Sequence, residues 1–224
     1  MREIVLDTET TGLDPDEGHR IVEVACVELM NHLPTGRYFH RYVNPEREVA
    51  PEAVAIHGLS DAILAQHPPF AAMADEFLAF IADTPLVIHN AEFDLRFLNA
   101  ELKRLARPAI AAAVVDTLAL AKRRFPGSPA SLDALCRRFA IDLSARDKHA
   151  ARLDCELLAA VYLELVGGRE PGLDLAAMDG PGTRRNAVAR PPRVPRPHAA
   201  PADELAAHAA FVARLKNPLW RQEG

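Results

Sequence analysis

A sharp change in composition at Gly167 and Gly168 divides this chain of 224 residues. Before it, apolar residues recur at the spacings of strands and helices. From Arg169 to Pro201 the chain has seven prolines, six arginines and three acids, with few large apolar residues. Such a segment cannot bury enough apolar surface to fold by itself. The sequence therefore predicts a globular domain over residues 1–168, a flexible linker over 169–201 and a helical tail over 202–224.

The tail resumes the periodicity of a helix. Its apolar stripe contains Leu205, His208, Phe211, Val212 and Leu215, and the segment ends in the apolar Pro218, Leu219 and Trp220. A segment this short cannot bury its own stripe, so we expect it to dock on another protein.

The charge balance restricts the partners of the chain. With 26 basic and 31 acidic residues, the net charge is -5, which argues against a broad cationic surface that grips long duplex nucleic acid. A protein that holds only a strand end, through metal ions bound by its own carboxylates, remains compatible with an acidic composition.

Three further features indicate the compartment. The segment MREIVLDTET carries acids where a secretory signal has apolar residues, and about 18 consecutive apolar residues, enough for a membrane span, occur nowhere. We expect a cytoplasmic protein without a membrane partner. Cys26, Cys136 and Cys155 lack the spacing of a zinc or redox site, which predicts reduced, mostly buried thiols.

The first 168 residues predict an α/β domain. Strands are expected at 2–8, 21–29, 37–44 and 84–90, the first three as an antiparallel meander. Helical patterns cover 71–82, 93–106, 116–125, 131–140 and 151–166, the last ending at the Gly-Gly stop. Strands followed by interleaved helices imply one central sheet covered by helices.

Two acids follow the first apolar strand. Asp7 and Glu9 come directly after Ile4, Val5 and Leu6, and a separation of two directs both side chains to the same face. Carboxyl ends of strands bind ligands in open α/β sheets, and converging acids require a neutralising cation. The alternative is a solvated strand end.

Two more acids lie on helical segments. Asp94 stands near the start of a helix, where an acid commonly serves the helix dipole. Asp154 lies on a partly apolar helix surface and needs a partner there. His149 precedes Asp154 by five residues, so the two cannot share a helical face; we place the histidine on the loop or first turn entering the helix.

This set of groups suits hard, oxygen-preferring cations, because four carboxylates from three elements converge without a basic residue among them. Two ions, Mg²⁺ or Mn²⁺, about 3.5–4 Å apart could stabilise the attacking and leaving oxygens of a phosphodiester. His149 could then take the proton of the attacking water at neutral pH.

The motifs DTETTGL, HNAEFD and HAARLD resemble the three exonuclease motifs of the DEDD superfamily, in its histidine-containing branch. The segments VNPEREVAPEAVAIHGLSD, FPGSPASLDALCRRFAID and ELAAHAAFVARLKNPLW resemble the proofreading epsilon-subunit family of bacterial DNA polymerase III. The resemblance covers nearly the whole chain except the linker. It implies a ribonuclease H-like α/β fold with a five-stranded mixed sheet flanked by helices.

Position by position, the resemblance implies roles for these residues. Asp7, Glu9 and Asp154 match direct metal ligands, Asp94 matches the fourth acid, and His149 matches the general base. The matched substrate contacts are Asp7, Thr8, Glu9, Thr10, Gly12, Leu13, Glu52, His57, Phe93 and Asp154. Leu13 would wedge beside the terminal base and Phe93 could stack on a base. The alternative for both is ordinary packing.

Several residues are expected to be structural. Asp116 and Asp133 each open a helical run, and Ser131 makes a capped first turn with Asp133. His89 and Asn90 are expected to end a strand beside the site without binding metal, and Gly127 to lie in a turn. The patterns GxSxG, GxGxxG and GxxxxGK[ST] do not occur.

The resemblance also implies partners. The tail would bind the polymerase (alpha) subunit, and such a tether raises the effective concentration of an exonuclease at the polymerase. Glu170 to Leu175 has the spacing of the family's sliding-clamp motif but begins with Glu in place of Gln, and a chance pair of leucines is the alternative.

The sequence thus predicts a 3′–5′ exodeoxyribonuclease that removes mispaired 3′ nucleotides as the proofreading subunit of a replicative polymerase. Two alternatives remain. The chain could act mainly as an architectural subunit that stabilises the polymerase, or it could be an RNA-trimming exonuclease of the same fold.

Overall fold

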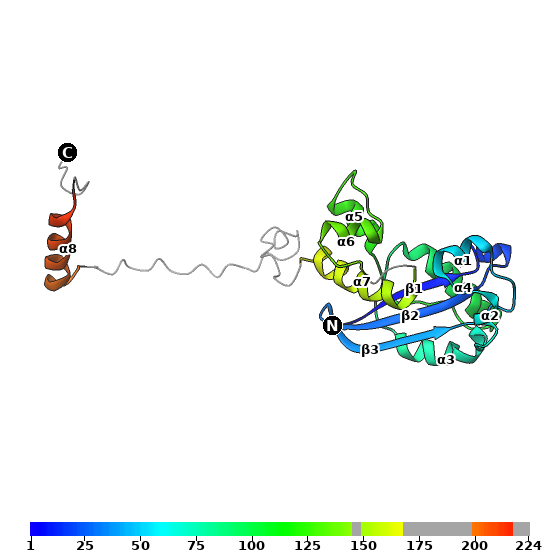
Figure 1. Cartoon of the computed structure of the whole chain (residues 1–224). Coiled ribbons are helices and arrows are strands. Elements are labelled where there is room, and N and C mark those ends of the chain that lie inside the picture. Colours follow the sequence, from blue (N-terminus) through cyan, green and yellow to red (C-terminus); the bar gives the residue numbers. More distant parts are fainter. Residues whose placement is uncertain (145–148, 168–198, 217–224) are drawn as a thin grey trace. The chain divides into compact units, whose positions relative to one another are not determined.

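The computed structural model describes residues 1–144, 149–167 and 199–216. Contacts between residues divide the chain into two units, Met1–Leu173 and Asp174–Gly224. The first unit contains a sheet with helices around it, and the described part of the second contains helix α8 (Figure 1).

The sheet has five strands in the order β3-β2-β1-β4-β5. Strands β1 (Arg2–Thr10), β2 (Ile21–Met30) and β3 (Leu33–Tyr42) form an antiparallel meander, as predicted. Strands β4 (Leu86–Ile88) and β5 (Val114–Asp116) continue parallel to β1. The mixed five-stranded sheet confirms the fold class implied by the resemblance.

One face of the sheet packs against aromatic side chains of two helices, α3 (Phe70–Ile81) and α4 (Ala91–Arg104). The even positions of β1, Ile4 and Leu6, point to this face and are fully buried. The core here includes Phe70, Phe77 and Phe97. Burial of this apolar surface anchors β1 and the start of α4 against each other.

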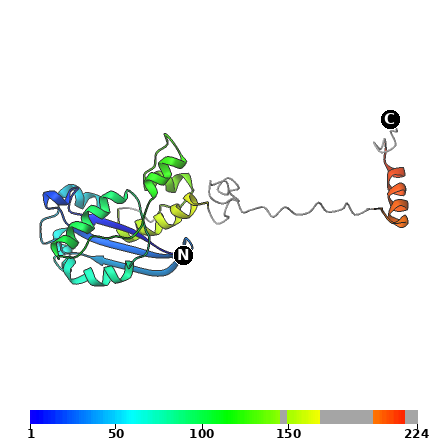
Figure 2. The same ribbon diagram turned by 180° about the vertical axis from the view of Figure 1, so that it is seen from behind.

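The opposite face is covered by α7 (Ala151–Leu165), which contacts both β1 and β2. Val5, Ala25 and Val27 of the sheet pack there against Cys155 and Leu158 of the helix. Helices α5 (Thr117–Arg124) and α6 (Leu132–Arg138) pack on the outer side of α7 and form a separate apolar cluster with it. Figure 2 shows this half of the unit from behind.

The observed helices confirm the periodic predictions within a few residues, but strand β5 and three short helices were not anticipated from periodicity. The three short helices are the 3-10 helix η1 (Pro15–Glu17) and the helices α1 (Pro51–His57) and α2 (Asp61–Leu64). Helix α1 begins with a proline at its first turn and ends at Gly58, whose φ of 80° requires the left-handed region that glycine tolerates. All three cysteines are free and buried, as predicted.

Helix α8 (Ala202–Arg214) forms in the predicted tail. Leu205 and Phe211 are exposed and Val212 is buried. Leu219, Trp220 and the candidate clamp motif Glu170 to Leu175 lie outside the described residues, as does the linker up to residue 198. Among the residues that the structure describes, none of the helices is long and apolar enough to traverse a bilayer.

Candidate active site

Strand β1 carries two of the predicted acids on the face that α7 covers. Asp7 lies opposite Ala25 of β2, and Glu9 lies opposite Glu23. Both acids are inside the strand, which runs to Thr10, and do not follow its end as expected. A strand that continues past its apolar half keeps both carboxylates in a fixed register, because β2 pairs with each of them.

Helix α7 brings Asp154 to these acids from above the sheet. Asp154 lies in the first turn and is buried. His149 stands just before the N-cap residue Ala150, as predicted, and its Nδ1 is 3.5 Å from Oδ2 of Asp154. The backbone N–H of His149 donates to the carbonyl of Ile56 in α1, with an N–O distance of 3.2 Å. The backbone of His149 is therefore anchored on α1, and its exposed imidazole faces Asp154.

A group of donor atoms with the size of a metal site forms where the strand and the helix meet. One atom each of Glu9, His149 and Asp154 lies within 4.8 Å of the others. Asp7 adjoins this group, and burial raises the pKa of its carboxyl, with further upward contributions from Asp94, Glu9, Asp154 and Glu23 in that order. Oxygen donors crowded in this way fit a divalent cation, which would relieve their repulsion.

Asp94 occupies a different position from the other acids. It is buried in the first turn of α4, and its Oδ1 accepts hydrogen bonds from the backbone N–H (2.9 Å) and the hydroxyl (2.7 Å) of Thr8. Burial raises its pKa to about 7, although the two bonds from Thr8 oppose the shift. Asp94 is outside the described three-residue donor group and links α4 to β1.

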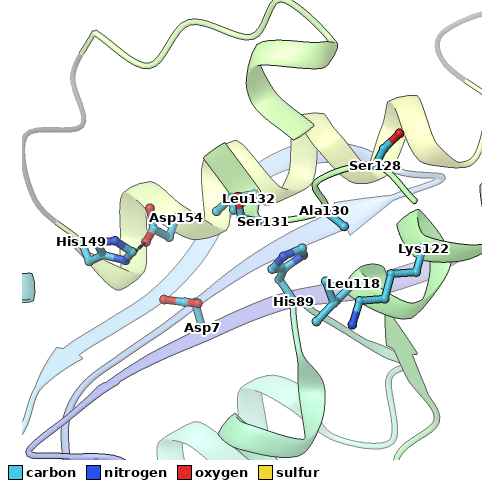
Figure 3. Close-up of a pocket in the computed structure, with 10 residues that line it drawn as sticks. All are labelled: Asp7, His89, Leu118, Lys122, Ser128, Ala130, Ser131, Leu132, His149 and Asp154. Atoms are coloured by element: carbon cyan, nitrogen blue, oxygen red, sulfur yellow. Dashed lines mark ion pairs between the residues drawn. The ribbon is translucent and has the colours of Figure 1, made fainter. Parts of the chain in front are cut away.

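Asp7, His149 and Asp154 line one cavity of about 520 Å³, which we name the α5–α7 cleft (Figure 3). Its remaining lining residues are His89, Leu118, Lys122, Ser128, Ala130, Ser131 and Leu132. Lys122 of α5 also lines this cleft, at the end that lies away from Asp7 and Asp154. That contact depends on the packing of α5 beside α7, which sequence spacing does not encode.

A second cavity of about 430 Å³, the β1–α1 cavity, lies on the other side of Glu9. It gathers eight predicted substrate contacts together with Glu17, His19, Ala50, Ala53 and Ile56. The eight are Thr8, Glu9, Thr10, Gly12, Leu13, Glu52, His57 and Phe93. Because Glu9 belongs to the donor group with His149 and Asp154, the cavity and the cleft meet at the acids.

Individual residues of the β1–α1 cavity differ in how free they are to contact a ligand. Leu13 is 80% exposed, so it does not serve core packing. Phe93 is partly buried and its ring lies 5.1 Å from that of Phe97, so it packs and lines the cavity at once. The hydroxyl of Thr10 donates to the carbonyl of Gly12 at 2.6 Å. A side chain on Gly12 would overlap the imidazole of His19, which explains the glycine.

Sequence reasoning missed a fifth acid beside the site. Glu23 of β2 is buried, and its Oε1 lies 2.7 Å from Nε2 of His40 on β3. Its charge contributes to raising the pKa of Asp7. The signal was present in the apolar run IVEVACVEL, where Glu23 is one of two acids, because a buried acid in a central strand requires a partner.

The residues predicted to be structural have structural contacts. Asp116 caps α5 by accepting from the N–H groups of Leu118 and Ala119, and Ser131 caps α6. Asp133 lies in the first turn of α6, 4.0 Å from Arg137. His89 and Asn90 directly follow β4, and Gly127 has a φ of 74°.

Comparison with known proteins places this geometry in a family. The exonuclease family (RNase_T) matches residues 4–162. A DNA polymerase III subunit epsilon of Rickettsia conorii is 54% identical over 174 residues, which are 76% of this chain and 76% of the relative. The subunit epsilon of Escherichia coli K12 is 43% identical over 239 residues, covering 98% of this chain and 97% of the relative. The chain belongs to the epsilon-subunit family of exonucleases.

The fold agrees with solved exonuclease structures. Exonuclease X, solved in complex with 5′ overhanging duplex DNA, superposes with a TM-score of 0.59 and 27% identity over 74% of this chain and 91% of that chain. Membership in the epsilon family makes this chain a 3′–5′ proofreading exonuclease. It also implies divalent metal ions as cofactors, which suits the crowded carboxylates between the cavity and the cleft.

Proposed function

We propose that this exonuclease holds the 3′-terminal nucleotide of DNA in the β1–α1 cavity and releases it as a deoxynucleoside 5′-monophosphate. One observation carries the proposal: the eight predicted substrate contacts line a single cavity, and that cavity meets the acidic donor group at Glu9. The sugar and base would lie against Leu13 and Phe93, and the scissile phosphodiester would lie at the acids. Glu52 and His57 would contact the terminal nucleotide from α1.

Two divalent ions, Mg²⁺ or Mn²⁺, would be held by Asp7, Glu9, Asp94 and Asp154. When bound, such ions neutralise the charge that develops on the attacking and leaving oxygens of a phosphodiester. The raised pKa of Asp7 supports this ligand set, since a buried carboxylate with four acidic neighbours is costly to ionise alone. Asp94 would act partly through Thr8, because its Oδ1 already fixes the backbone of β1.

His149 would remove the proton of the attacking water. Its ring is exposed, and its Nδ1 lies 3.5 Å from Asp154, a distance that tightens readily in a substrate complex. The carboxylate of Asp154 would orient the ring and stabilise its protonated form. A histidine suits this task near neutral pH because its ordinary pKa is about 6.5.

Proofreading selectivity would follow from the cost of unpairing. A mispaired terminus frays more readily than a paired one, so the enzyme need not recognise the wrong base. The β1–α1 cavity supports this view because it offers an apolar wedge, Leu13, at its exposed rim. A purely architectural role would require neither the donor group nor this cavity.

The experiment that tests the substrate class compares four oligonucleotides of equal length: DNA and RNA, each with a matched or mismatched 3′ end in a duplex. We expect Mg²⁺-dependent release of monophosphates from DNA, faster from the mismatched end. Faster cleavage of RNA would favour the RNA-trimming alternative, and equal rates at both DNA ends would contradict selectivity by fraying.

The tail would connect the exonuclease to the polymerase (alpha) subunit. Leu205 and Phe211 are exposed on α8, and Leu215 follows the helix at 37% exposure. His208 lies on the same stripe by its spacing, and Leu219 and Trp220 would extend the contact. Apolar residues at these spacings fit a groove on a partner. The sliding-clamp contact at Glu170 to Leu175 rests on sequence spacing alone.

A shortened chain that ends at Gly168 separates tethering from catalysis. We expect it to cleave single-stranded DNA within about twofold of the full chain, because every proposed catalytic residue precedes the cut. It should fail to co-elute with the polymerase subunit in size-exclusion chromatography. Co-elution of the shortened chain would contradict the tether, and loss of nuclease activity in a folded shortened chain would contradict the separation.

A further inference from the structure

The α5–α7 cleft has a wall that the proposed reaction does not use. Across from the acids, Lys122 of α5 and the serines at 128 and 131 line the same cavity. Figure 3 shows Lys122 at the end of the cleft that lies away from Asp7 and Asp154. With a volume of about 520 Å³, the cleft has the size of sites that bind small ligands.

Lys122 is free to bind an anion. Its side chain is exposed, and among residues 1–144, 149–167 and 199–216 it forms no ion pair. The hydroxyl of Ser131 accepts the N–H of Ala134 and keeps its own proton to donate. An ammonium and a hydroxyl proton are the donors that hold a phosphodiester.

His89 builds this wall without offering a contact of its own. Its Nδ1 lies 2.9 Å from the hydroxyl of Thr117, and it hydrogen-bonds the backbone of Ala130. Burial lowers its pKa, so the ring is neutral at physiological pH. His89 thereby connects the end of β4 to the loop between α5 and α6, which carries Ser128.

We propose that the α5–α7 cleft is the subsite for the nucleotide on the 5′ side of the scissile bond, and that Lys122 binds a phosphodiester of the single strand there. This inference rests on the proposed function. The terminal nucleotide occupies the β1–α1 cavity, and the scissile phosphate lies at the acids where this cavity meets the α5–α7 cleft. The remaining strand continues into the cleft. The subsite recognises the DNA backbone and not the base.

The test compares two substrates of the full chain with Mg²⁺. A single-stranded DNA decamer would occupy both hollows, whereas the p-nitrophenyl ester of thymidine 5′-monophosphate has no nucleotide on the leaving side. Lys122→Ala should lower kcat/KM for the decamer about fivefold to tenfold, mainly through KM, and leave hydrolysis of the ester within twofold. In a plot of log kcat/KM for the decamer against log salt concentration, the negative slope should become shallower by about 0.7. This is the contribution of one phosphate of a single strand.

Lys103→Ala provides the matched control, because Lys103 is also an exposed lysine in the last turn of a helix but lines neither the cleft nor the β1–α1 cavity. Equal effects of the two substitutions on the decamer would overturn the subsite while leaving the proposed function intact. An equal loss on the decamer and the ester in Lys122→Ala would also overturn it. Failure of the unaltered chain to hydrolyse either substrate would overturn the proposed function itself.

Discussion

The face of β1 beneath α7 has buried acids at both ends, and the two ends are built in opposite ways. At the N-terminal end, Glu3 is 1% exposed and accepts a hydrogen bond of 2.7 Å from the hydroxyl of Tyr162. Its other oxygen lies 2.7 Å from Nδ1 of His32. The protein thus supplies a hydroxyl donor for one oxygen of this carboxylate and places an imidazole near the other, although that second contact lacks the geometry of a hydrogen bond.

At the opposite end of the strand, Asp7 is surrounded by further acids, whereas Glu3 accepts a hydrogen bond from Tyr162. The charged groups that help to raise the pKa of its carboxyl are Asp94, Glu9, Asp154 and Glu23. Between the two ends, Val5, Ala25 and Cys155 pack as ordinary core. The comparison teaches that burial of an acid does not by itself indicate function; what distinguishes Asp7 is that its neighbours are further acids, whose repulsion a bound cation would relieve.

Neutralising each acid in turn is the most direct test of the difference between Asp7 and Glu3. Asp7→Asn should reduce Mg²⁺-dependent cleavage of single-stranded DNA by at least about 10³-fold, because it removes a proposed metal ligand. It should also raise the Tm of the metal-free protein, since the amide carries no charge to bury. In a domain of this size, each 1 kcal/mol of added stability raises the Tm by about 2–4 °C.

Glu3→Gln is the matched control for Asp7→Asn. It should keep cleavage within twofold and destabilise the fold by about 1–3 kcal/mol, because the amide offers Tyr162 and His32 one acceptor oxygen where the carboxylate offers two. Activity assays and thermal unfolding in the presence of EDTA check both variants. The functional reading of the Asp7 end is wrong if Asp7→Asn destabilises the metal-free protein and retains cleavage.

Each end also contains a histidine paired with an acid, which allows a second comparison. His149→Ala should lower kcat by about 10²–10⁴-fold and remove one ionisation from the pH–rate profile, because it removes the proposed general base. His32→Ala should leave kcat and the profile unchanged. Steady-state kinetics across pH measure this difference, and an unaltered profile in His149→Ala would indicate another base.

A further expected effect is on stability against pH and not on activity. Burial raises the pKa of Asp94 to about 7, so between about pH 4 and pH 7 the folded metal-free protein binds a proton that the unfolded chain has released. The stability contribution is therefore fully present below about pH 4 and is lost as pH rises through 7. We expect a decline on the order of a few kcal/mol across this window.

Thermal unfolding in EDTA at several pH values measures this decline, and Asp94→Asn should flatten it. Added Mn²⁺ should restore stability at neutral pH, because the ion binds the folded state alone. A decline of equal size in Asp94→Asn would assign the effect to other groups.

Much of the fold could be predicted because long elements carry strong periodicity. The meander and the helices at 70–81, 91–104 and 151–165 were all anticipated within a few residues. Strand β5 was not, since three residues are too few to show a period and Val114 at its start is 39% exposed. Helix α1 was hidden because its seven residues contain no full apolar stripe.

The site was predictable as a set of residues but not as an arrangement. Spacing on β1 correctly gave Asp7 and Glu9 one face, and the position of His149 before α7 followed from helix geometry. Contacts between elements distant in sequence were not encoded in this way. Lys122 and Glu23 reach the site only through the packing of α5 and the pairing of β2.

The hydrogen bond from the His149 backbone to Ile56 connects two tasks that are usually considered apart. Helix α1 lines the β1–α1 cavity, which we propose binds the terminal nucleotide. The same helix anchors His149, which we propose activates the attacking water. A substitution that shifts α1 should consequently slow turnover as well as weaken affinity. The binding of the terminal nucleotide and the rate of its removal would then both depend on the position of α1.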